Sequence, residues 1–304
     1  MNERKPDRVG QVFAALGKSV CYVGLFLGMQ IAVMFLGAVV LGAVAGALQA
    51  MGGQVDPDWF YRLLMDNSML LSLISGLLTL AVVLVFYLIR RKKLSEALCL
   101  RPVPGPTLFT GAALAPGLYV VVTMALALLP EAWLESYSEA SADVADGTLV
   151  GVIAVAVVAP VVEEIIFRGL MMDRLSRAMP GWLAVVLSAA VFGICHWHPV
   201  WSAYAFVLGA VFAFIDLRAG SILPSILGHV AFNAIGQVFS FIPETEEGTE
   251  LVIALGVLIL IGIIAPILDR RAIAALFHPA PKAAPAGLEM PRKPKNYDYD
   301  PWDL

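Results

Sequence analysis

The chain has 304 residues, of which 60% are hydrophobic and 14% charged, and its mean hydropathy is +0.83. A soluble globular chain has roughly 45–50% apolar and about 25% charged residues, so these values exclude an ordinary soluble protein and predict an integral membrane protein. The net charge of −4 is small, and we expect no nucleic-acid partner.

Stretches without charged residues mark the predicted membrane spans, because a spanning helix needs about 20 mainly apolar residues. In chain order they are residues 19–55, 67–89, 102–130, 147–162, 178–215, 219–243 and 251–268. The fourth stretch is expected to continue past its charged residues to about Arg177. The fifth stretch, residues 178–215, is too long for one span. Because Pro199 can break a helix, the fifth is divided into two short helices. The pattern predicts an all-α, polytopic transmembrane bundle of about eight spanning helices that enclose a polar cavity.

Charges between the spans predict the orientation by the positive-inside rule. The predicted inner segments hold Arg4, Lys5, Arg8, Lys18, Arg90, Arg91, Lys92, Lys93, Arg101, Arg174, Arg177, Arg218, Arg270 and Arg271. The outer loops hold Asp56, Asp58, Asp66, Glu131, Glu135, Glu139, Asp143, Asp146, Glu244, Glu246, Glu247 and Glu250, with Arg62 as the one basic exception. Both termini are therefore expected in the cytoplasm. The first apolar run is longer than a signal-peptide core of about 7–15 residues, so it is predicted to be a retained helix. Residues 59–64 are expected to form either a short interfacial segment or an ordinary loop.

Ionisable side chains inside the fourth span are costly in a bilayer and tend to be functional. Glu163 lies roughly 16–21 Å from the helix end near Arg174–Arg177, at about 1.5 Å per residue, which is near mid-bilayer. Glu164 and Arg168 are four residues apart and can pair. Adjacent helical residues point in different directions, so Glu163 is expected to face a wet cavity and to have a separate task. The alternative is an ion network that only ties helices together.

Two further helices each contribute an imidazole. On the fifth, His196 follows Gly193, which allows close helix approach, and neighbouring Cys195 is a possible thiol nucleophile, although buried cysteine usually acts as a small hydrophobe. On the seventh, His229 and Asn233 lie one turn apart on one face. That polar face also includes Ser225, Gly236, Gln237 and Ser240. The alternative for these histidines is hydrogen bonding between helices.

These groups together match the needs of amide hydrolysis by water. A carboxylate and an imidazole can take a proton from water, and an imidazolium or amide N–H can stabilise an oxyanion. Glu163, His196 and His229 could instead bind zinc with one open position, although the chain has no H-E-x-x-H motif. We favour a site that requires no cofactor, because the residues already supply a base and oxyanion donors.

Three ordered motifs resemble those of the CPBP intramembrane proteases, a family that includes CAAX prenyl endopeptidases and bacteriocin-processing or self-immunity (Abi) proteins. They are Glu163-Glu164-x-x-Phe167-Arg168, Phe192-x-x-x-His196 and His229-x-x-x-Asn233, and the resemblance covers about residues 149–240. It implies that Glu163 and His196 activate water and that His229 and Asn233 bind the oxyanion. It also implies supporting roles for Glu164 and Arg168, and it leaves both glutamate-type and metal-dependent chemistry open.

The expected organisation follows from the spans and the resemblance. Residues 1–18 form a cytoplasmic segment, 19–146 hold helices one to three, and 147–243 hold the catalytic CPBP-type core with helices four to seven. Residues 244–271 hold the last helix, and 272–304 form a disordered cytoplasmic tail. The expected location is the bacterial plasma membrane, and the expected substrate is a membrane-associated protein or peptide. A non-catalytic immunity or scaffold protein and a proton-coupled transporter remain the alternative functions.

Overall fold

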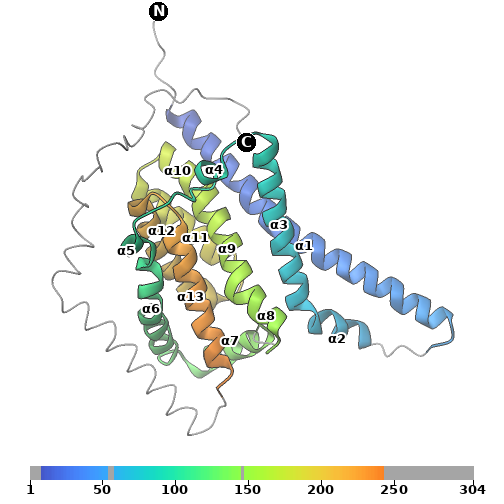
Figure 1. The fold of residues 1–304 in the computed structure, drawn as a ribbon. Coiled ribbons are helices and arrows are strands. Elements are labelled where there is room, and N and C mark those ends of the chain that lie inside the picture. Colours follow the sequence, from blue (N-terminus) through green and yellow to red (C-terminus); the bar gives the residue numbers. More distant parts are fainter. Residues whose placement is uncertain (1–7, 54–57, 145–146, 243–304) are drawn as a thin grey trace, which may run out of the picture.

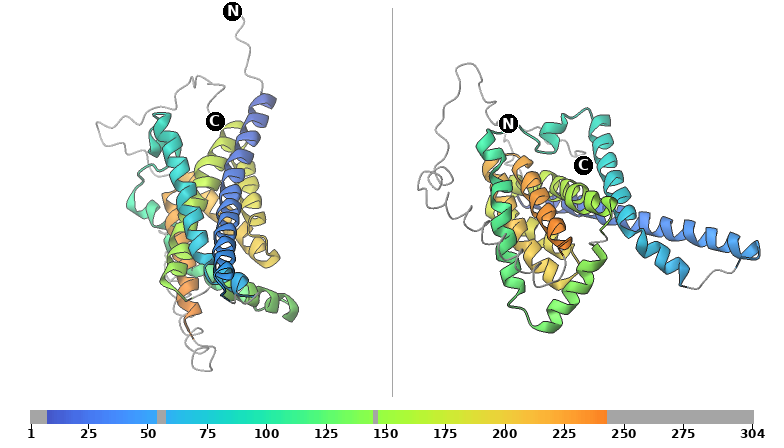
Figure 2. Two further views of the ribbon diagram at one scale, coloured as in Figure 1. Left: turned by 90° about the vertical axis from the view of Figure 1, so that its right-hand side faces the viewer. Right: turned by 60° about the horizontal axis from the view of Figure 1, so that its bottom comes forward.

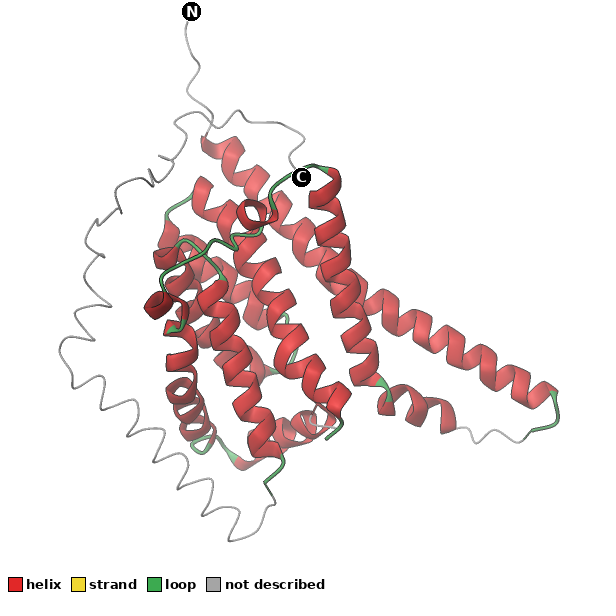
Figure 3. Cartoon of the chain, viewed as in Figure 1, coloured by secondary structure: helices red, strands yellow, loops and turns green. Residues whose placement is uncertain are grey.

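Helices form all the regular structure in the part of the chain that this computed structural model describes, namely residues 8–53, 58–144 and 147–242 (Figure 1 and Figure 3). The first half contains α1 (Arg8–Ala50), α2 (Trp59–Asp66), α3 (Ser68–Ile89), α4 (Leu94–Ala97), α5 (Gly105–Leu108), α6 (Thr110–Leu126) and α7 (Glu131–Val144). The second half contains α8 (Leu149–Ile153), η1 (Ala154–Val158), α9 (Ala159–Glu163), η2 (Glu164–Met172), α10 (Asp173–Ala178), α11 (Gly181–Ile194), α12 (Pro199–Ala219) and α13 (Leu223–Ser240), where η marks a π-helical segment. The all-α prediction is confirmed.

Five helices of the described chain are long and apolar enough to cross a membrane, which confirms the polytopic architecture. They are Val9–Ala50, Ser68–Ile89, Gly105–Leu126, Leu149–Ala178 and Pro199–Ala219. The apolar helix α11 has only 14 residues, and α13 has 18 residues but carries polar side chains that lower its hydropathy. These seven segments correspond in position to the first seven predicted spans. The eighth predicted span and the tail lie outside the described residues.

The two ends of the bundle differ in charge. The basic residues next to α4 and on α10 lie at one end, whereas α2 and the acidic helix α7 lie at the other (Figure 1). Residues 131–144 were expected to be part of a loop, but they form α7. Its first residue, Glu131, interacts favourably with the helix dipole, and alanine and glutamate favour helix. Residues 59–66 also form a helix, α2, and not an ordinary loop.

The first helix is much longer than a bilayer requires. Its 43 residues span about 64 Å at ~1.5 Å per residue, against a hydrocarbon thickness of about 30 Å. Four buried residues, Ala15, Ser19, Tyr22 and Phe26, repeat every three or four positions and pack its first half onto the bundle. Beyond Phe26 no residue of α1 is buried, and this half leaves the bundle beside α2 (Figure 1 and Figure 2).

The segments from α8 to α10 join into one central helix of 30 residues, Leu149–Ala178, as expected for the fourth span. All nine residues of η2 are buried, because α1, α11 and neighbouring helices pack around them. Two π-helical segments interrupt the α-helical pattern, one just before Pro160 and one beginning at Glu164. Such segments are rare and often occur at functional sites.

Two close crossings fix the helices that carry the histidines. A Cβ atom on Gly193 would lie 2.7 Å from the Ser202 carbonyl oxygen, so Gly193 permits α11 to pack closely on α12, as expected. A Cβ atom on Gly228 would lie 2.9 Å from the backbone of Gly111, so α6 and α13 cross with their backbones in contact. Glycine at these crossings is a common device of membrane bundles.

Candidate active site

The six predicted site residues come from three parts of the bundle. Glu163, Glu164 and Arg168 lie on the central helix, and His229 and Asn233 lie on α13. His196 was predicted on a helix, but it lies in the turn after α11, which ends at Ile194. The chain leaves the helical path there because Trp197 adopts a positive φ of 59° and His198 is extended before a proline.

His229 is held by a fully buried carboxylate. Its Nδ1 atom lies 2.9 Å from Oε1 of Glu164, and Arg168 Nη1 lies 3.2 Å from the same oxygen. The side chains of Glu164 and Arg168 have no exposed surface. Because the guanidinium favours the ionised carboxylate, Nδ1 of His229 is the hydrogen donor. The predicted pairing of Glu164 with Arg168 is therefore present, and it includes His229.

The second nitrogen of His229 faces the other glutamate. Glu163 Oε2 lies 3.8 Å from His229 Nε2, and the Glu163 side chain is 17% exposed. The two glutamates thus differ in burial, and although they were expected to point in different directions, both lie beside one imidazole. A helix that widens between α9 and η2 turns less per residue, which brings successive side chains closer in direction.

His196 is oriented through Phe192. Its Nδ1 atom donates a hydrogen bond of 2.8 Å to the Phe192 carbonyl oxygen, which leaves Nε2 as the free ring nitrogen. The Phe192 ring lies 4.7 Å from the His196 ring and 5.8 Å from the His229 ring, and the guanidinium of Arg168 lies 4.2 Å above it. Phe192 therefore packs against the rings of both histidines and against the guanidinium of Arg168.

Asn233 is anchored to the central helix by a carbonyl that Pro160 leaves free. In η1 the N–H of Ala159 bonds the carbonyl of Ala154, five residues earlier. The next carbonyl in this register, on Val155, would pair with residue 160, which is a proline and has no N–H. Asn233 Nδ2 donates to this Val155 oxygen at 2.9 Å. Pro160 thus leaves a carbonyl that Asn233 binds, and one N–H of Asn233 remains for another acceptor.

Comparison with known proteins identifies this segment. Residues 145–235 match the model of a family described as Type II CAAX prenyl endopeptidase Rce1-like, which belongs to the CPBP family. Residues 145–235 form a CPBP domain. No curated protein and no solved structure matches the chain.

All six site residues lie inside the CPBP domain, which covers less than a third of the chain. Membership implies a protease, hence a hydrolase, that acts in a lipid bilayer on a membrane-associated peptide. The apolar helices and the family together make the chain an integral membrane protein.

The donor set for zinc is not assembled in the CPBP domain. The described part of the chain holds no group of three or more His, Cys, Asp or Glu side chains placed to bind one metal ion. Of the predicted ligands, Glu163 and His229 approach each other. We therefore derive no step through a metal.

Cys195 is poorly placed as a nucleophile. It is half-buried and has the Glu163 carboxylate as an electrostatic neighbour. Reactive cysteines need positively charged surroundings that favour the thiolate, so the surroundings of Cys195 do not activate its thiol.

Asp216 and Gly209 are parts of this cluster that the sequence did not single out. Asp216 is 3% exposed and is an electrostatic neighbour of Glu164 and Arg168. A Cβ atom on Gly209 would lie 2.9 Å from Arg168 Nη2 and 2.9 Å from Phe192 Cδ1. Asp216 could have been found in the sequence, because it is an acidic residue in a predicted cytoplasmic segment whose other charged residues are mostly basic. Nothing in the sequence indicated a role for Gly209.

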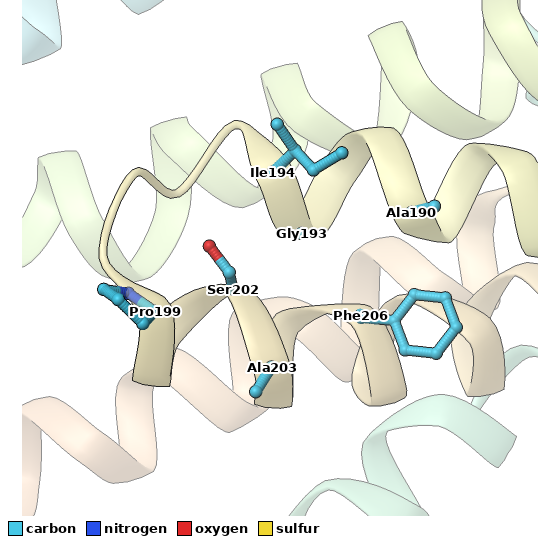
Figure 4. Close-up of a pocket in the computed structure, with 7 residues that line it drawn as sticks. All are labelled: Ala190, Gly193, Ile194, Pro199, Ser202, Ala203 and Phe206. Atoms are coloured by element: carbon cyan, nitrogen blue, oxygen red, sulfur yellow. The ribbon is translucent and has the colours of Figure 1, made fainter. Parts of the chain in front are cut away.

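A shallow apolar groove lies between α11 and the first half of α12, next to the turn that contains His196 (Figure 4). Its lining residues are Ala190, Gly193, Ile194, Pro199, Ser202, Ala203 and Phe206. None of the six site residues lines this groove, so we do not include it in the candidate active site.

Proposed function

We propose that the protein is an intramembrane endopeptidase that hydrolyses a peptide bond of a membrane-associated protein or peptide. Glu163 and His196 activate water, and His229 and Asn233 stabilise the oxyanion. The main support is that Glu163 lies 3.8 Å from one nitrogen of an imidazole whose other nitrogen is held by buried Glu164. A base and an oriented donor are thus adjacent at one edge of a buried cluster.

In the first step a water molecule attacks the carbonyl carbon of the substrate. The distance of 3.8 Å between Glu163 and His229 exceeds a hydrogen bond, and a water oxygen beside this line could contact both groups. Glu163 takes one proton from the water while the water oxygen bonds to carbon. The free Nε2 of His196 accepts a hydrogen bond from the same water and orients it.

In the second step the tetrahedral intermediate carries its negative charge on the former carbonyl oxygen. This oxyanion accepts hydrogen bonds from Nε2–H of His229 in its imidazolium form, whose Nδ1–H is held by Glu164, and from the N–H of Asn233 that Val155 does not use. The C–N bond then breaks, and Glu163 returns its proton to the leaving amine. The products are a carboxylic acid and an amine, and Glu163 regains its charge.

The test uses the full chain reconstituted in lipid bilayers. Two sets of fluorogenic, membrane-anchored peptides serve as substrates, one with a prenylated C-terminus of the CAAX type and one without a prenyl group. We expect cleavage of at least one set by the wild type, and loss of cleavage in Glu163→Ala and in His196→Ala with the fold retained. Activity should survive a chelator that removes zinc.

The proposal is wrong if both variants cleave as fast as the wild type. A wild type that binds the peptides and cleaves neither set would favour the scaffold alternative. Proton flux that disappears in Glu163→Gln would favour the transporter alternative. Sequencing the new peptide termini by mass spectrometry identifies the bond that is cut.

A further inference from the structure

Four consecutive cations follow the apolar helix α3, on the far side of the chain's catalytic helices in sequence. They are Arg90, Arg91, Lys92 and Lys93, and all four are exposed. The helix before them has 22 residues and is long enough to cross a membrane, so its end lies at the level of the lipid headgroups. The four cations therefore lie at the membrane surface.

The turn that carries these cations is a helix-capping motif with an uncommon residue. The N–H of Lys92 bonds the Tyr87 carbonyl at 3.0 Å, and the N–H of Arg91 bonds the Leu88 carbonyl at 2.9 Å. These two bonds define a Schellman motif, whose left-handed position is usually glycine. Here that position is Arg91, with a φ of 52°.

The arginine at this position costs the fold some stability. A left-handed φ brings Cβ close to the backbone in every residue except glycine. The dipole of α3 favours cations at its end, but Arg90, the C-cap residue, already supplies one without a positive φ. Strained residues commonly persist where their side chains serve a function, so Arg91 is a candidate for binding.

The surroundings of the turn add positive charge. Arg101 follows α4, and Arg177 lies on α10, at the same end of the bundle as the end of α3 (Figure 1). The helices α4 and α10 contain one acidic residue each. Glu96 lies 3.6 Å from Lys93 with both side chains exposed, and Asp173 pairs with Arg177. Cations thus outnumber anions around the turn.

The helix directly before the turn presents apolar surface. Val85, Leu88 and Ile89, in the last two turns of α3, are 51%, 58% and 74% exposed. Cations at the membrane surface above exposed aliphatic side chains match the two parts of an acidic phospholipid, namely a phosphate headgroup and acyl chains. A soluble phosphate would use only the cations.

We propose that the turn Arg90–Lys93 binds the headgroup of an acidic phospholipid, with the acyl chains along the end of α3. Lysine and arginine form strong charge-assisted hydrogen bonds with phosphate. Clusters of four or more cations next to the cytoplasmic end of a membrane helix favour anionic lipids, and this end is the predicted cytoplasmic one. The binding is separate from peptide hydrolysis and does not require it.

The test titrates the full chain in detergent with phosphatidylglycerol and, separately, with phosphatidylcholine, and measures bound lipid by native mass spectrometry. The wild type should prefer phosphatidylglycerol. Arg91→Gly should bind it about fivefold more weakly, which is the contribution of one cation near an anionic surface, whereas Arg91→Lys should keep the affinity. The control is Arg62→Gln on α2, an exposed cation between Asp58 and Asp66, and it should keep the affinity too.

Thermal unfolding separates binding from a role in the fold. Without acidic lipid, Arg91→Gly should unfold at the same or a higher temperature than the wild type, because glycine adopts a positive φ without strain. Phosphatidylglycerol should raise the unfolding temperature of the wild type more than that of Arg91→Gly. Salt should reduce this difference by screening the charges.

The proposal is overturned if Arg91→Gly binds phosphatidylglycerol as tightly as the wild type, or if the wild type binds both lipids equally. A lower unfolding temperature of Arg91→Gly without lipid would also overturn it, since the arginine would then serve the fold. Displacement of phosphatidylglycerol by an equal concentration of glycerol phosphate would assign the turn to a soluble phosphate and reject the lipid.

Discussion

Glu164 and His229 lie 65 residues apart in sequence and are joined by a buried hydrogen bond of 2.9 Å between Oε1 and Nδ1. This bond connects the central helix to α13 and leaves the other imidazole nitrogen directed at Glu163. A buried carboxylate that fixes one nitrogen of a histidine determines which nitrogen is free to act. The predictions below test the groups that surround this bond.

Glu163→Gln should abolish activity and leave stability unchanged. The amide cannot act as a base, and general-base catalysis contributes about 10²- to 10⁴-fold to the rate. The Glu163 side chain is partly exposed and lies outside the Glu164–Arg168 pair, so its loss should not unfold the protein. Peptidase assays and thermal unfolding measure the two effects. Glu135→Gln, on the exposed face of α7, is the matched control and should keep full activity.

Arg168→Met should destabilise the protein strongly. It leaves Glu164 as a fully buried carboxylate without its cation, and breaking a buried ion pair costs about 3–5 kcal/mol. The free energy of unfolding in mixed micelles measures the effect. Arg177→Met breaks a more exposed pair with Asp173 and should cost less than about 1 kcal/mol. Equal losses for the two variants would contradict the burial argument.

Gly209→Ala should disturb the site without touching a catalytic group. The added methyl would lie 2.9 Å from Arg168 Nη2 and from Phe192 Cδ1, so one of them must move. Overpacking of this kind typically costs about 1–3 kcal/mol, and activity should fall because Phe192 contacts both histidines. Gly46→Ala is the control, since its methyl would meet no atom within 4 Å. The idea fails if the two variants behave alike in unfolding and peptidase assays.

Pro160→Ala should lower activity without lowering stability. The new N–H can pair with the Val155 carbonyl, which Asn233 now holds, so Asn233 loses its anchor and the oxyanion loses an oriented donor. Losing one such donor costs about 10²- to 10³-fold in kcat. Pro116→Ala, at the other described proline inside a helix interior, should leave kcat unaffected. Equal kcat in Pro160→Ala and wild type would remove the assigned role of the proline.

Cys99 should resist thiol reagents until the pH is far above neutral. Burial raises the pKa of its thiol from 9.0 to about 12, and Asp173 adds to this effect. The folded protein therefore retains the thiol proton at a pH where an unfolded chain has lost it, so stability should decrease as pH rises above about 9. Alkylation at increasing pH, with the exposed Cys21 as internal reference, measures the difference. Labelling of both cysteines at similar rates near neutral pH would contradict this prediction.

The sequence predicted the elements and the polar residues of the site because lipid makes both conspicuous. Charge-free stretches predict the helices, and ionisable residues such as Glu163 and His229 are rare enough within them to indicate a functional site. The position of His196 in a turn was missed, since apolar residues continue through the turn and only backbone geometry shows where the helix ends. Asp216 was missed because it lies at a helix end, where an acidic residue usually meets water.

The π-helical segments were not predictable from spacing alone. They depend on tertiary contacts, such as the Asn233 side chain on the Val155 carbonyl, which compensate the lost α-helical pairing. The change from α9 to the π-helical segment η2 explains why adjacent glutamates reach one imidazole. The helix α7 was missed for another reason, since its acidic residues were interpreted only as the charge pattern of an outer loop.

The two π-helical segments also make the central helix intolerant of changes in length. Deleting one residue between Thr148 and Glu163 would let η1 relax to a regular α-helix, and everything before the deletion would rotate relative to the catalytic carboxylate. Loops at either end of the same helix can absorb insertions far more easily. Among natural variants of this chain, gaps should therefore gather outside Leu149–Ala178, and the number of residues within it should stay constant even where their identities change.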